Sequence, residues 1–499
     1  MPPHAVPMTM PPAVEGIPYY LHAAYIISAS MFIIGIKWMN SPVTARKGNQ
    51  LSSLAMLLAV GVTFADPHLL HPALNLGTNV DLTHANEVLR NQALRWGTVA
   101  SGIFVGSLIG YIMAKTVKMT DMPQAVAIFN GLGGGAAALV SVATFIGMAR
   151  GLTLQGAEES TISILAGTII GSVTFSGSMI AFGKLQGLIS GRPVPFPRAL
   201  QVLLGFGVVG IAGYIMTGRL ELTLFLIAFA MALIFGIGLV LPIGGADMPV
   251  VISLLNSFTG TAAAFTGFVL GNNVLIIAGA LVGASGFILT TLMCKAMNRN
   301  LGNVLFGNFG AVTAGGGAAT EGGTEIETSV EDAALMLAYA QQVIIVPGYG
   351  LAVAQAQHGV QKMAELLEKK GVQVKYAIHP VAGRMPGHMN VLLAEANVPY
   401  SLLFDMDDIN PEFEKADVAL IIGANDVTNP AARNDASSPI YGMPILDCDK
   451  AKNVIVMKRG RGKGFAGIEN PLYFEPKTKM LFGDAKKTVG ELVSAIEET

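Results

Sequence analysis

Long apolar runs separated by short polar gaps make up the first 300 residues of the chain. About 20 consecutive apolar residues cross a bilayer as one helix, so this pattern predicts a polytopic α-helical membrane domain over residues 1–300. The second run is the shortest. We expect about nine spans, at residues 19–39, 51–65, 96–114, 123–148, 161–183, 199–217, 222–241, 249–270 and 273–294.

The pattern changes beyond residue 300. A Gly-, Ala- and Thr-rich stretch at 310–328 predicts a flexible linker within 301–330, followed by a short helix from Ser329 to Tyr339. Short β-branched runs then alternate with helical stretches at 351–370 and 388–396. This alternation predicts a soluble α/β domain over 331–499, with a Rossmann-like, doubly wound parallel sheet. Its expected strands are 342–347, 372–378, 401–404, 418–422 and 454–457.

Composition agrees with two regions in different solvents. The 499 residues are 52% hydrophobic and 13% charged, and the 59 glycines are typical of small-residue packing between membrane helices. A formal net charge of −2 gives no basic surface for nucleic acid, which we exclude as a partner. Cys294 and Cys448 lie in different regions, so both are expected to be free thiols, and no metal site is expected.

Basic residues between the spans indicate the orientation of the chain. The Pro-rich residues 1–18 lack the basic segment of a cleavable signal, so the first run is expected to be retained as a span. Lys and Arg accumulate in cytoplasmic loops. Most of the basic residues between the spans fall on one side of the membrane, which also carries the C-terminal domain, so we expect that side to be cytoplasmic. These residues are Lys37, Arg46, Lys47, Lys115, Lys118, Lys184, Arg192, Arg198, Lys295 and Arg299, against Arg90, Arg95, Arg150 and Arg219 on the other side.

Two segments of the membrane half repeat one another. An Asp-Met-Pro triplet at 121–123 precedes Asn130, Gly134 and three alanines, and the triplet at 247–249 precedes Asn256, Gly260 and three alanines at the same spacing. The spans that follow also correspond, through glycines 167 and 171 in one copy and 279 and 283 in the other. The repeat predicts a pseudo-symmetric helix bundle.

The repeated asparagines need hydrogen-bond partners inside the apolar layer. In one interpretation Asn130 and Asn256 bond across helix interfaces and stabilise the packing. In the other they line a hydrated proton path, with Asp247 at its cytoplasmic mouth and Ser176 extending it. Neither asparagine titrates, so such a path also needs an ionisable group. The sequence leaves both interpretations open.

A glycine-containing turn follows the first expected strand of the soluble domain. Gly348 and Gly350 permit a tight turn and a close approach to a pyrophosphate, and the following helix directs its N-terminal amides towards it. Val353 replaces the usual third glycine, and the second strand ends without the acid that binds a ribose 2′-hydroxyl, which disfavours NAD. Lys458 and Arg459 instead favour the 2′-phosphate of NADP.

Asp426 follows the fourth expected strand, where ligands bind in sheets of this kind. It is either a turn-forming residue or, if it is buried beside a nicotinamide, a carboxyl group whose pKa responds to the charge of that ring.

Five segments carry a resemblance to a known family: Gly244 to Pro249, Gly348 to Gln357, His379 to Asn390, Gly423 to Asp426, and Lys458-Arg459. Together they resemble the beta subunit of proton-translocating nicotinamide nucleotide transhydrogenase. The similarity extends over nearly the whole chain and is most specific from residue 244 onward.

The resemblance implies an NAD(P)+ transhydrogenase of the Si-specific or Re/Si-specific, proton-translocating type. NADP(H) would be held by this chain and NAD(H) by a separate alpha subunit, with direct hydride transfer between them while protons cross the membrane. We expect a dimer of heteromers in the lipid bilayer of a bacterial inner membrane. The residues expected at NADP(H) are Gly348, Tyr349, Gly350, Ala352, Val353, Arg384, Gly423, Asn425, Asp426, Lys458, Arg459 and Gly460, with Asp426 also binding the redox-linked proton and residues 383–389 forming a coupling loop.

The chain departs from this family's pattern at two positions. Asn130 stands where known beta subunits carry a membrane histidine, which allows the proton carrier to lie on a partner helix. Phe465 replaces an aromatic hydroxyl after the basic pair, so a hydrogen bond from that position is lost.

Two other functions fit parts of the pattern. A transporter or channel regulated by a cytoplasmic NADP-binding domain also accounts for the asparagines and the repeat. A membrane-anchored reductase with inert helices leaves the polar repeat unexplained.

Overall fold

A computed structural model describes residues 19–39, 41–64, 82–149, 157–190, 194, 196–244, 247–297, 300–306, 324–384, 387–436, 438, 440–462, 464 and 466–499. The chain divides into two compact units, residues 1–115 with 270–278 and residues 116–269 with 279–499. In the first unit α1 (Tyr19–Met39) packs along α2 (Pro42–Phe64), where the buried Ser28 hydroxyl donates to the Ala55 carbonyl at 2.7 Å. This unit also contains most of α4 (Leu82–Thr116).

The long helices of the second unit follow a short 3₁₀ turn, η1 (Met119–Asp121). They are α5 (Met122–Ala149), α6 (Ala157–Leu185), α7 (Arg198–Met216), α8 (Leu222–Val240), α9 (Met248–Leu270) and α10 (Asn273–Ala296), whose first turns belong to the other unit, and they precede the short α11 (Leu301–Phe306).

Within the described residues, eight helices are long and apolar enough to cross a membrane, namely α1 and α4 to α10. The expected number of about nine therefore agrees closely with the structure. The exception is the second expected span, which is the last part of α2. That helix begins with a polar segment that contains Arg46, Lys47 and Gln50, and this segment lowers its overall apolar character.

The glycines of the internal repeat lie where helices cross. In the first copy a Cβ placed on Gly134 of α5 would lie 2.9 Å from the carbonyl oxygen of Gly171 on α6. In the second copy a Cβ on Gly260 of α9 would lie 2.8 Å from the carbonyl oxygen of Gly279 on α10, and it would also overlap the amide of Gly283. Helix backbones approach this closely only where a hydrogen replaces the side chain. The repeated sequence therefore builds the same helix crossing twice.

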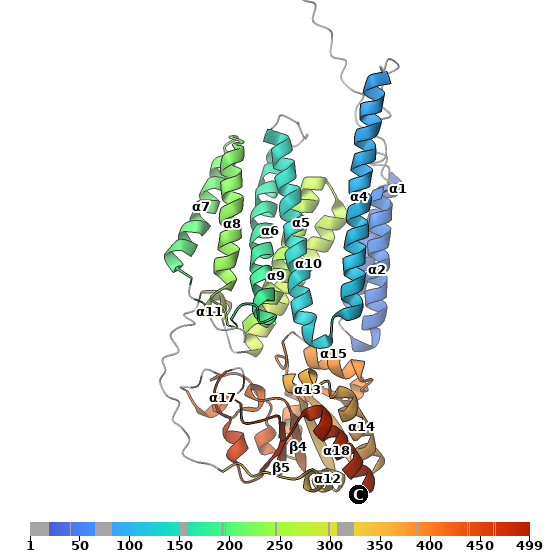
Figure 1. The fold of residues 1–499 in the computed structure, drawn as a ribbon, viewed down its shortest axis with the longest axis vertical. Coiled ribbons are helices and arrows are strands. Elements are labelled where there is room, and N and C mark those ends of the chain that lie inside the picture. The colour runs from blue at the N-terminus through green and yellow to red at the C-terminus, as the bar shows by residue number, and fades with distance from the viewer. Residues whose placement is uncertain are drawn as a thin grey trace, which may run out of the picture. The chain divides into compact units, whose positions relative to one another are not determined.

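A single parallel sheet forms the core of the C-terminal region (Figure 1). The strand order is β3-β2-β1-β4-β5-β6, which confirms the doubly wound fold, and the order reverses between β1 and β4. The strands are β1 (Gln342–Pro347), β2 (Gln373–Ile378), β3 (Leu403–Asp405), β4 (Val418–Ile422), β5 (Asn453–Lys458) and β6 (Thr478–Phe482), all paired in parallel.

Both faces of this sheet are covered, and β1 and β4 are buried along their whole lengths. This burial explains their continuous runs of β-branched and aliphatic residues. One face packs against α12 (Val330–Ala338), α13 (Tyr349–Ala354), α14 (Gln357–Lys369), α15 (His388–Glu395) and α18 (Ala485–Glu498). The other face packs against shorter elements, α16 (Met406–Ile409), η6 (Cys448–Lys450) and η7 (Pro471–Phe474).

Three details of the expected secondary structure are wrong. The helix expected at 351–370 is divided into α13 and α14, because Gln355 adopts a left-handed conformation with φ 51° and closes the first helix through its amide, which donates to Ala352 O. The third strand begins at Leu403 instead of residue 401, after a 3₁₀ turn. Finally, β6 was not expected at all.

Candidate functional site

Two glycine turns meet where the strand order reverses. The Gly348 amide donates to Ile422 O and the Gly350 amide donates to Gly423 O, both at 2.9 Å. A Cβ on Gly350 would lie 2.7 Å from Gly423 Cα, and one on Gly423, whose φ is 68°, would lie 2.6 Å from the Leu351 nitrogen. Glycine is therefore required for the loops after β1 and β4 to touch. The contact holds the start of α13 at the carboxyl edge of the sheet.

The structure explains why a third glycine is not needed in this turn. In a dinucleotide-binding fingerprint that glycine permits close packing of helix on strand. Here the Val353 side chain is 51% exposed, whereas its neighbour Ala352 is fully buried. The small residue at the helix–sheet contact is Ala352, and Val353 lies on the open side.

A groove runs along this edge of the sheet and collects most of the predicted contacts. Its lining includes Gly348, Tyr349, Gly350, Val353, Arg384, Gly423, Asn425, Asp426, Lys458, Arg459 and Gly460. The one predicted residue that does not line it is the buried Ala352. The backbone glycines and the cations that line one groove form a donor set that fits a dinucleotide with a phosphorylated ribose.

Arg384 lies over an aromatic ring in this groove. Its guanidinium carbon is 4.4 Å from the centroid of the Tyr349 ring, and its backbone amide donates to Nδ1 of His388 at 3.1 Å. His388 is buried, and burial, with a smaller effect of Arg384, lowers its pKa. A neutral His388 therefore accepts from the loop and positions Arg384. Met385 and Pro386, in the expected coupling loop, lie outside the described residues.

His379 follows β2, at the end of the strand where an acid would bind a ribose 2′-hydroxyl. It is 2% exposed, its Nδ1 accepts from the Val381 amide at 3.2 Å, and its Nε2 is 2.8 Å from Pro444 O. Burial lowers its pKa to about 4. The ring is therefore neutral, with the proton on Nε2.

Asp426 begins η5 (Asp426–Thr428), directly after the loop of β4. Its Oδ2 accepts from the Ala466 amide at 2.9 Å, and the backbone of Gly464 lies against its other carboxylate oxygen. The loop that follows β5 thus folds over this carboxylate. Phe465, the residue expected to pack over the nucleotide, lies outside the described residues.

The basic pair is at the carboxyl end of β5. The Lys458 ammonium lies 4.7 Å from the centroid of the Tyr473 ring. Burial lowers the pKa of Lys458, while the nearby carboxylates of Glu325 and Asp426 oppose this shift. Arg459 is exposed. The two cations are therefore adjacent in sequence but differ in environment, since one is packed on a ring and the other is open to solvent.

Comparison with known proteins identifies the family. A family model described as NAD(P) transhydrogenase beta subunit matches residues 21–495. The chain belongs to this family. Two relatives, each named NAD(P) transhydrogenase subunit beta and both from Rhodospirillum rubrum, one of them from a named strain, are 48% identical to it over 485 residues. These matches cover 95% of this chain and 98% of each relative.

The expected family is therefore confirmed. The chain is a membrane-embedded subunit of an NAD(P) transhydrogenase, an enzyme that uses NAD(P)(H), and the beta designation implies an alpha subunit as its partner. In the described part of this transhydrogenase subunit, no three His, Cys, Asp or Glu side chains are grouped to hold a metal ion.

The two repeated asparagines of the transhydrogenase subunit have different environments. Asn130 is buried on α5, and its Nδ2 donates to the carbonyl of Ile252 on α9 at 3.2 Å. The Thr259 hydroxyl donates back to Asn130 O at 3.0 Å. Asn256 is half-buried, and within the described residues its side chain has no hydrogen-bond partner. Asn130 thus joins two helices, whereas Asn256 retains its hydrogen-bonding capacity.

The other expected path residues lie on different helices. Ser176 donates to Ser172 O of its own helix at 3.0 Å and lies against Gly236 of α8, whereas Asn130 bonds α9. Asp247 is buried at the start of α9. The structure shows no direct bond between Ser176 and Asn130.

Lys184, one of the cations assigned to the cytoplasmic side, is buried at the end of α6. Its Nζ donates to Leu241 O at 2.5 Å and to Ile243 O at 2.7 Å, which are carbonyls at and just beyond the end of α8. This lysine therefore caps a helix instead of facing solvent.

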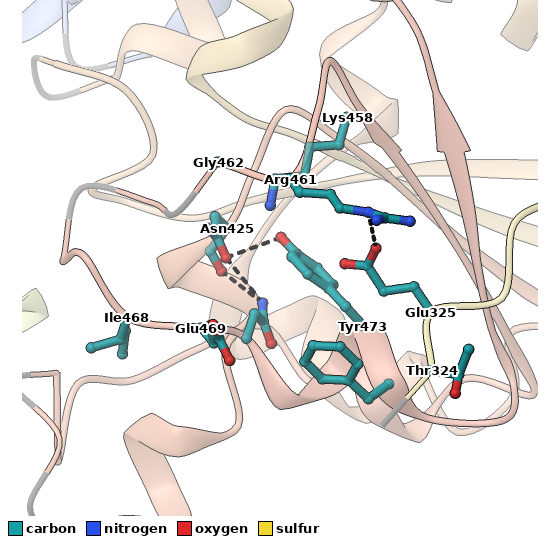
Figure 2. A pocket seen from close by; sticks show the side chains of 11 residues that line it. Thr324, Glu325, Asn425, Lys458, Arg461, Gly462, Ile468, Glu469 and Tyr473 are labelled. Atoms are coloured by element: carbon teal, nitrogen blue, oxygen red, sulfur yellow. Dashed lines mark hydrogen bonds and ion pairs between the residues drawn. The ribbon is translucent and has the colours of Figure 1, made fainter. Parts of the chain in front are cut away.

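Several residues around this groove are not predicted from the sequence. The Tyr473 hydroxyl donates to Asn425 Oδ1 at 3.0 Å, and Asn470 Nδ2 donates to both Asn425 O and Oδ1 at 3.3 Å. These bonds fix the orientation of Asn425 at the edge of a second cavity of about 480 Å³, which Figure 2 shows. Arg461 and Glu325 also line it. Arg461 follows Lys458 closely in the sequence, and this proximity could have identified Arg461 as a candidate site residue.

Proposed function

We propose that this subunit holds NADP(H) in the groove at the carboxyl edge of its sheet, while the alpha subunit holds NAD(H). Direct hydride transfer between the two nicotinamides is then coupled to proton movement across the membrane. The observation that supports this most strongly is the contact between the Gly348–Gly350 and Gly423 turns, with Lys458 and Arg459 on the neighbouring loop. NADP(H), when bound, supplies the nicotinamide that gives or receives the hydride.

The residues of the groove divide the binding task. Gly348, Gly350 and the first turn of α13 leave room for the pyrophosphate, and Val353 stands on the open side of that turn. Lys458 and Arg459 hold the 2′-phosphate. Neutral, fully engaged His379 after β2 offers no carboxylate to a ribose 2′-hydroxyl, which disfavours NAD.

Asp426 is proposed to carry the redox-linked proton. Its carboxylate lies between the β4 loop and the loop after β5, within hydrogen-bond distance of the Ala466 amide. A change of charge at the nicotinamide would alter the proton affinity of this carboxylate. A change in its protonation would in turn alter how the second loop is held. Arg384, held over Tyr349, would position the loop at 383–389 beside the nucleotide.

The membrane half is proposed to provide the proton path. Asn130, Asn256, Asp247 and Ser176 would line it, with the titrating group on a partner helix. We place residues 1–300 in a bacterial inner membrane, 301–330 as the linker and 331–499 in the cytoplasm. The enzyme would be a dimer of heteromers of the Si-specific or Re/Si-specific type.

Reconstitution tests this function. The subunit and its alpha partner in proteoliposomes should transfer hydride between NADPH and an NAD+ analogue and take up protons at the same time. We expect Asp426→Asn to retain nucleotide and to lower the hydride-transfer rate by on the order of 10²-fold. Asp407→Asn, at an exposed position on α16, is the matched control.

Two results would change the assignment. If nucleotide binds but the reconstituted complex transfers no hydride, the chain is a transporter or channel regulated by an NADP-binding domain. If Asp426→Asn retains the full rate and an unchanged pH profile, Asp426 is a structural turn residue.

A further inference from the structure

A short acidic segment, residues 324–328, lies along the outer edge of β6, and we refer to it as the acidic strap. Its backbone pairs with the strand, because the Met480 amide donates to Ile326 O at 2.7 Å and the Thr328 amide donates to Met480 O at 3.0 Å. Glu325 and Glu327 are two residues apart in this extended segment, so their side chains project on the same side. The strap therefore presents two carboxylates beside the basic loop after β5.

Both carboxylates bind one guanidinium. Arg461 Nε lies 2.9 Å from a Glu325 oxygen, and its Nη2 lies 3.1 Å from a Glu327 oxygen. The Arg461 side chain is 71% exposed and that of Glu325 is 13% exposed. The strap thus neutralises a cation that stands only three positions after Lys458.

This ion pair lies at the wall of the second cavity. Lys458, Arg461 and Glu325 all line it, together with Asn425 and Tyr473, and Figure 2 shows Arg461 reaching across towards Glu325. Its volume, about 480 Å³, is in the range of small-ligand pockets. The cavity therefore holds a phosphate-binding lysine of the proposed site and an arginine whose charge is already paired.

We infer that Arg461 is a third cation for the 2′-phosphate of the nucleotide and that Glu325 and Glu327 compete with the phosphate for it. This inference rests on the proposed binding of NADP(H) by this chain. Each pair is weak because Arg461 is 71% exposed, but two carboxylates act together on its one guanidinium. A phosphate binds a guanidinium more strongly, through two charge-assisted hydrogen bonds. The phosphate therefore displaces the strap, and the strap weakens the binding of NADP(H) and lowers the preference for a phosphorylated ribose.

The test is a mutant cycle on the full subunit in detergent, with NADP+ and NAD+ titrated by calorimetry. Glu325→Gln with Glu327→Gln keeps the shape of the strap and releases Arg461. We expect it to tighten NADP+ binding about tenfold and to leave NAD+ binding unchanged. In the Arg461→Ala background the same pair of changes should give no gain. Glu497→Gln with Glu498→Gln on α18 removes two carboxylates outside the cavity and should change neither affinity.

The outcomes separate this inference from the proposed function. If wild type prefers NADP+ and Lys458→Ala loses that preference, but the strap changes have no effect, the inference is wrong and the function stands. An equal gain in the Arg461→Ala background would also overturn it, because the gain would then come from the general loss of negative charge. If wild type shows no preference for NADP+, the proposed function itself fails. Thermal unfolding of each variant shows that it is folded.

Discussion

Glycine permits close backbone contact in both halves of this molecule, but under different constraints. Between the membrane helices, at Gly134 with Gly171 and at Gly260 with Gly279, the residues have ordinary helical backbones and need only space. At the edge of the sheet, Gly423 needs space and also a φ of 68°, which other residues adopt only with strain.

A helix crossing in the membrane tolerates a small added side chain better than the turn at the edge of the sheet does. Two helices can separate slightly to accept a methyl group, so a membrane crossing is adjustable. The Gly423 turn has no such freedom, because the backbone of Gly350 and Leu351 lies directly against it. The edge of the sheet, where we propose that the nucleotide binds, therefore tolerates less change in its backbone than the helix bundle does.

The largest effect is expected for Gly423→Ala. Left-handed backbone with a Cβ costs about 1–2 kcal/mol, and the overlap with Gly350 adds about 1–3 kcal/mol. Urea unfolding of a soluble segment 324–499, which contains both cores of the sheet, measures the loss. The matched control is Gly490→Ala on α18, where nothing lies within 4 Å and where alanine should stabilise by about 0.5–1 kcal/mol. Equal effects of the two changes would mean that the left-handed turn at Gly423 imposes no special constraint.

A pH effect of similar size should arise from His379. Its pKa is about 4 in the folded domain, against 6.5 for an unperturbed histidine, so between these values the unfolded chain binds more protons. The contribution of His379 to the free energy of unfolding is therefore fully present above pH 6.5. It falls by up to about 1.4 kcal/mol for each pH unit as the pH decreases towards 4. His388, whose pKa is also lowered, acts in the same direction.

Urea unfolding of the same segment between pH 4 and 7 measures this slope. His379→Gln should reduce it, although the variant starts from a lower stability at pH 7. A slope unchanged by the substitution would mean that His379 titrates normally in the fold.

A smaller loss of stability is expected at the helix crossings, where the glycines need space but no special backbone conformation. Gly260→Ala must separate α9 from α10 at the Gly279 carbonyl, at a cost of about 1–3 kcal/mol. Gly210→Ala on α7, with nothing within 4 Å, is the control. Thermal unfolding in detergent should show a lower midpoint for the first variant only. A loss as large as that of Gly423→Ala would remove the contrast between the two regions.

The smallest effect on stability should distinguish the two asparagines. Asn130→Leu removes the bond to Ile252 O and should lower stability by about 1 kcal/mol, whereas Asn256→Leu breaks no side-chain bond and should leave stability nearly unchanged. If Asn256 lines the proton path, its replacement lowers proton uptake in proteoliposomes. Normal uptake by both variants would leave only the helix-packing role.

The sequence predicted the architecture because its signals were local. The strand–turn–helix at Gly348, the buried runs of β1 and β4 and the repeat at Asn130 and Asn256 each depend on neighbours in the chain. The groove residues could be predicted as well, because the carboxyl ends of parallel strands meet at one edge of the sheet.

What could not be predicted depends on distant contacts. The amphipathic pattern at 351–370 carries no glycine or proline at the point where Gln355 turns left-handed. β6 includes a charged residue, Lys479, and is fixed by pairing with β5. The bond between Arg461 and Glu325 joins residues 136 positions apart, which no local pattern reveals.

We propose above all that this chain holds NADP(H) through its basic pair, Lys458 and Arg459. The most direct measurement is calorimetric titration of the purified subunit, and of its Lys458→Ala/Arg459→Ala variant, with NADP+ and with NAD+. We expect wild type to bind NADP+ far more tightly than NAD+. Because each charge-assisted contact contributes about 1.5–3 kcal/mol, the double variant should lose most of that preference while its NAD+ affinity stays the same. Equal affinity of the wild-type subunit for the two nucleotides would mean that the basic pair does not select a phosphorylated ribose.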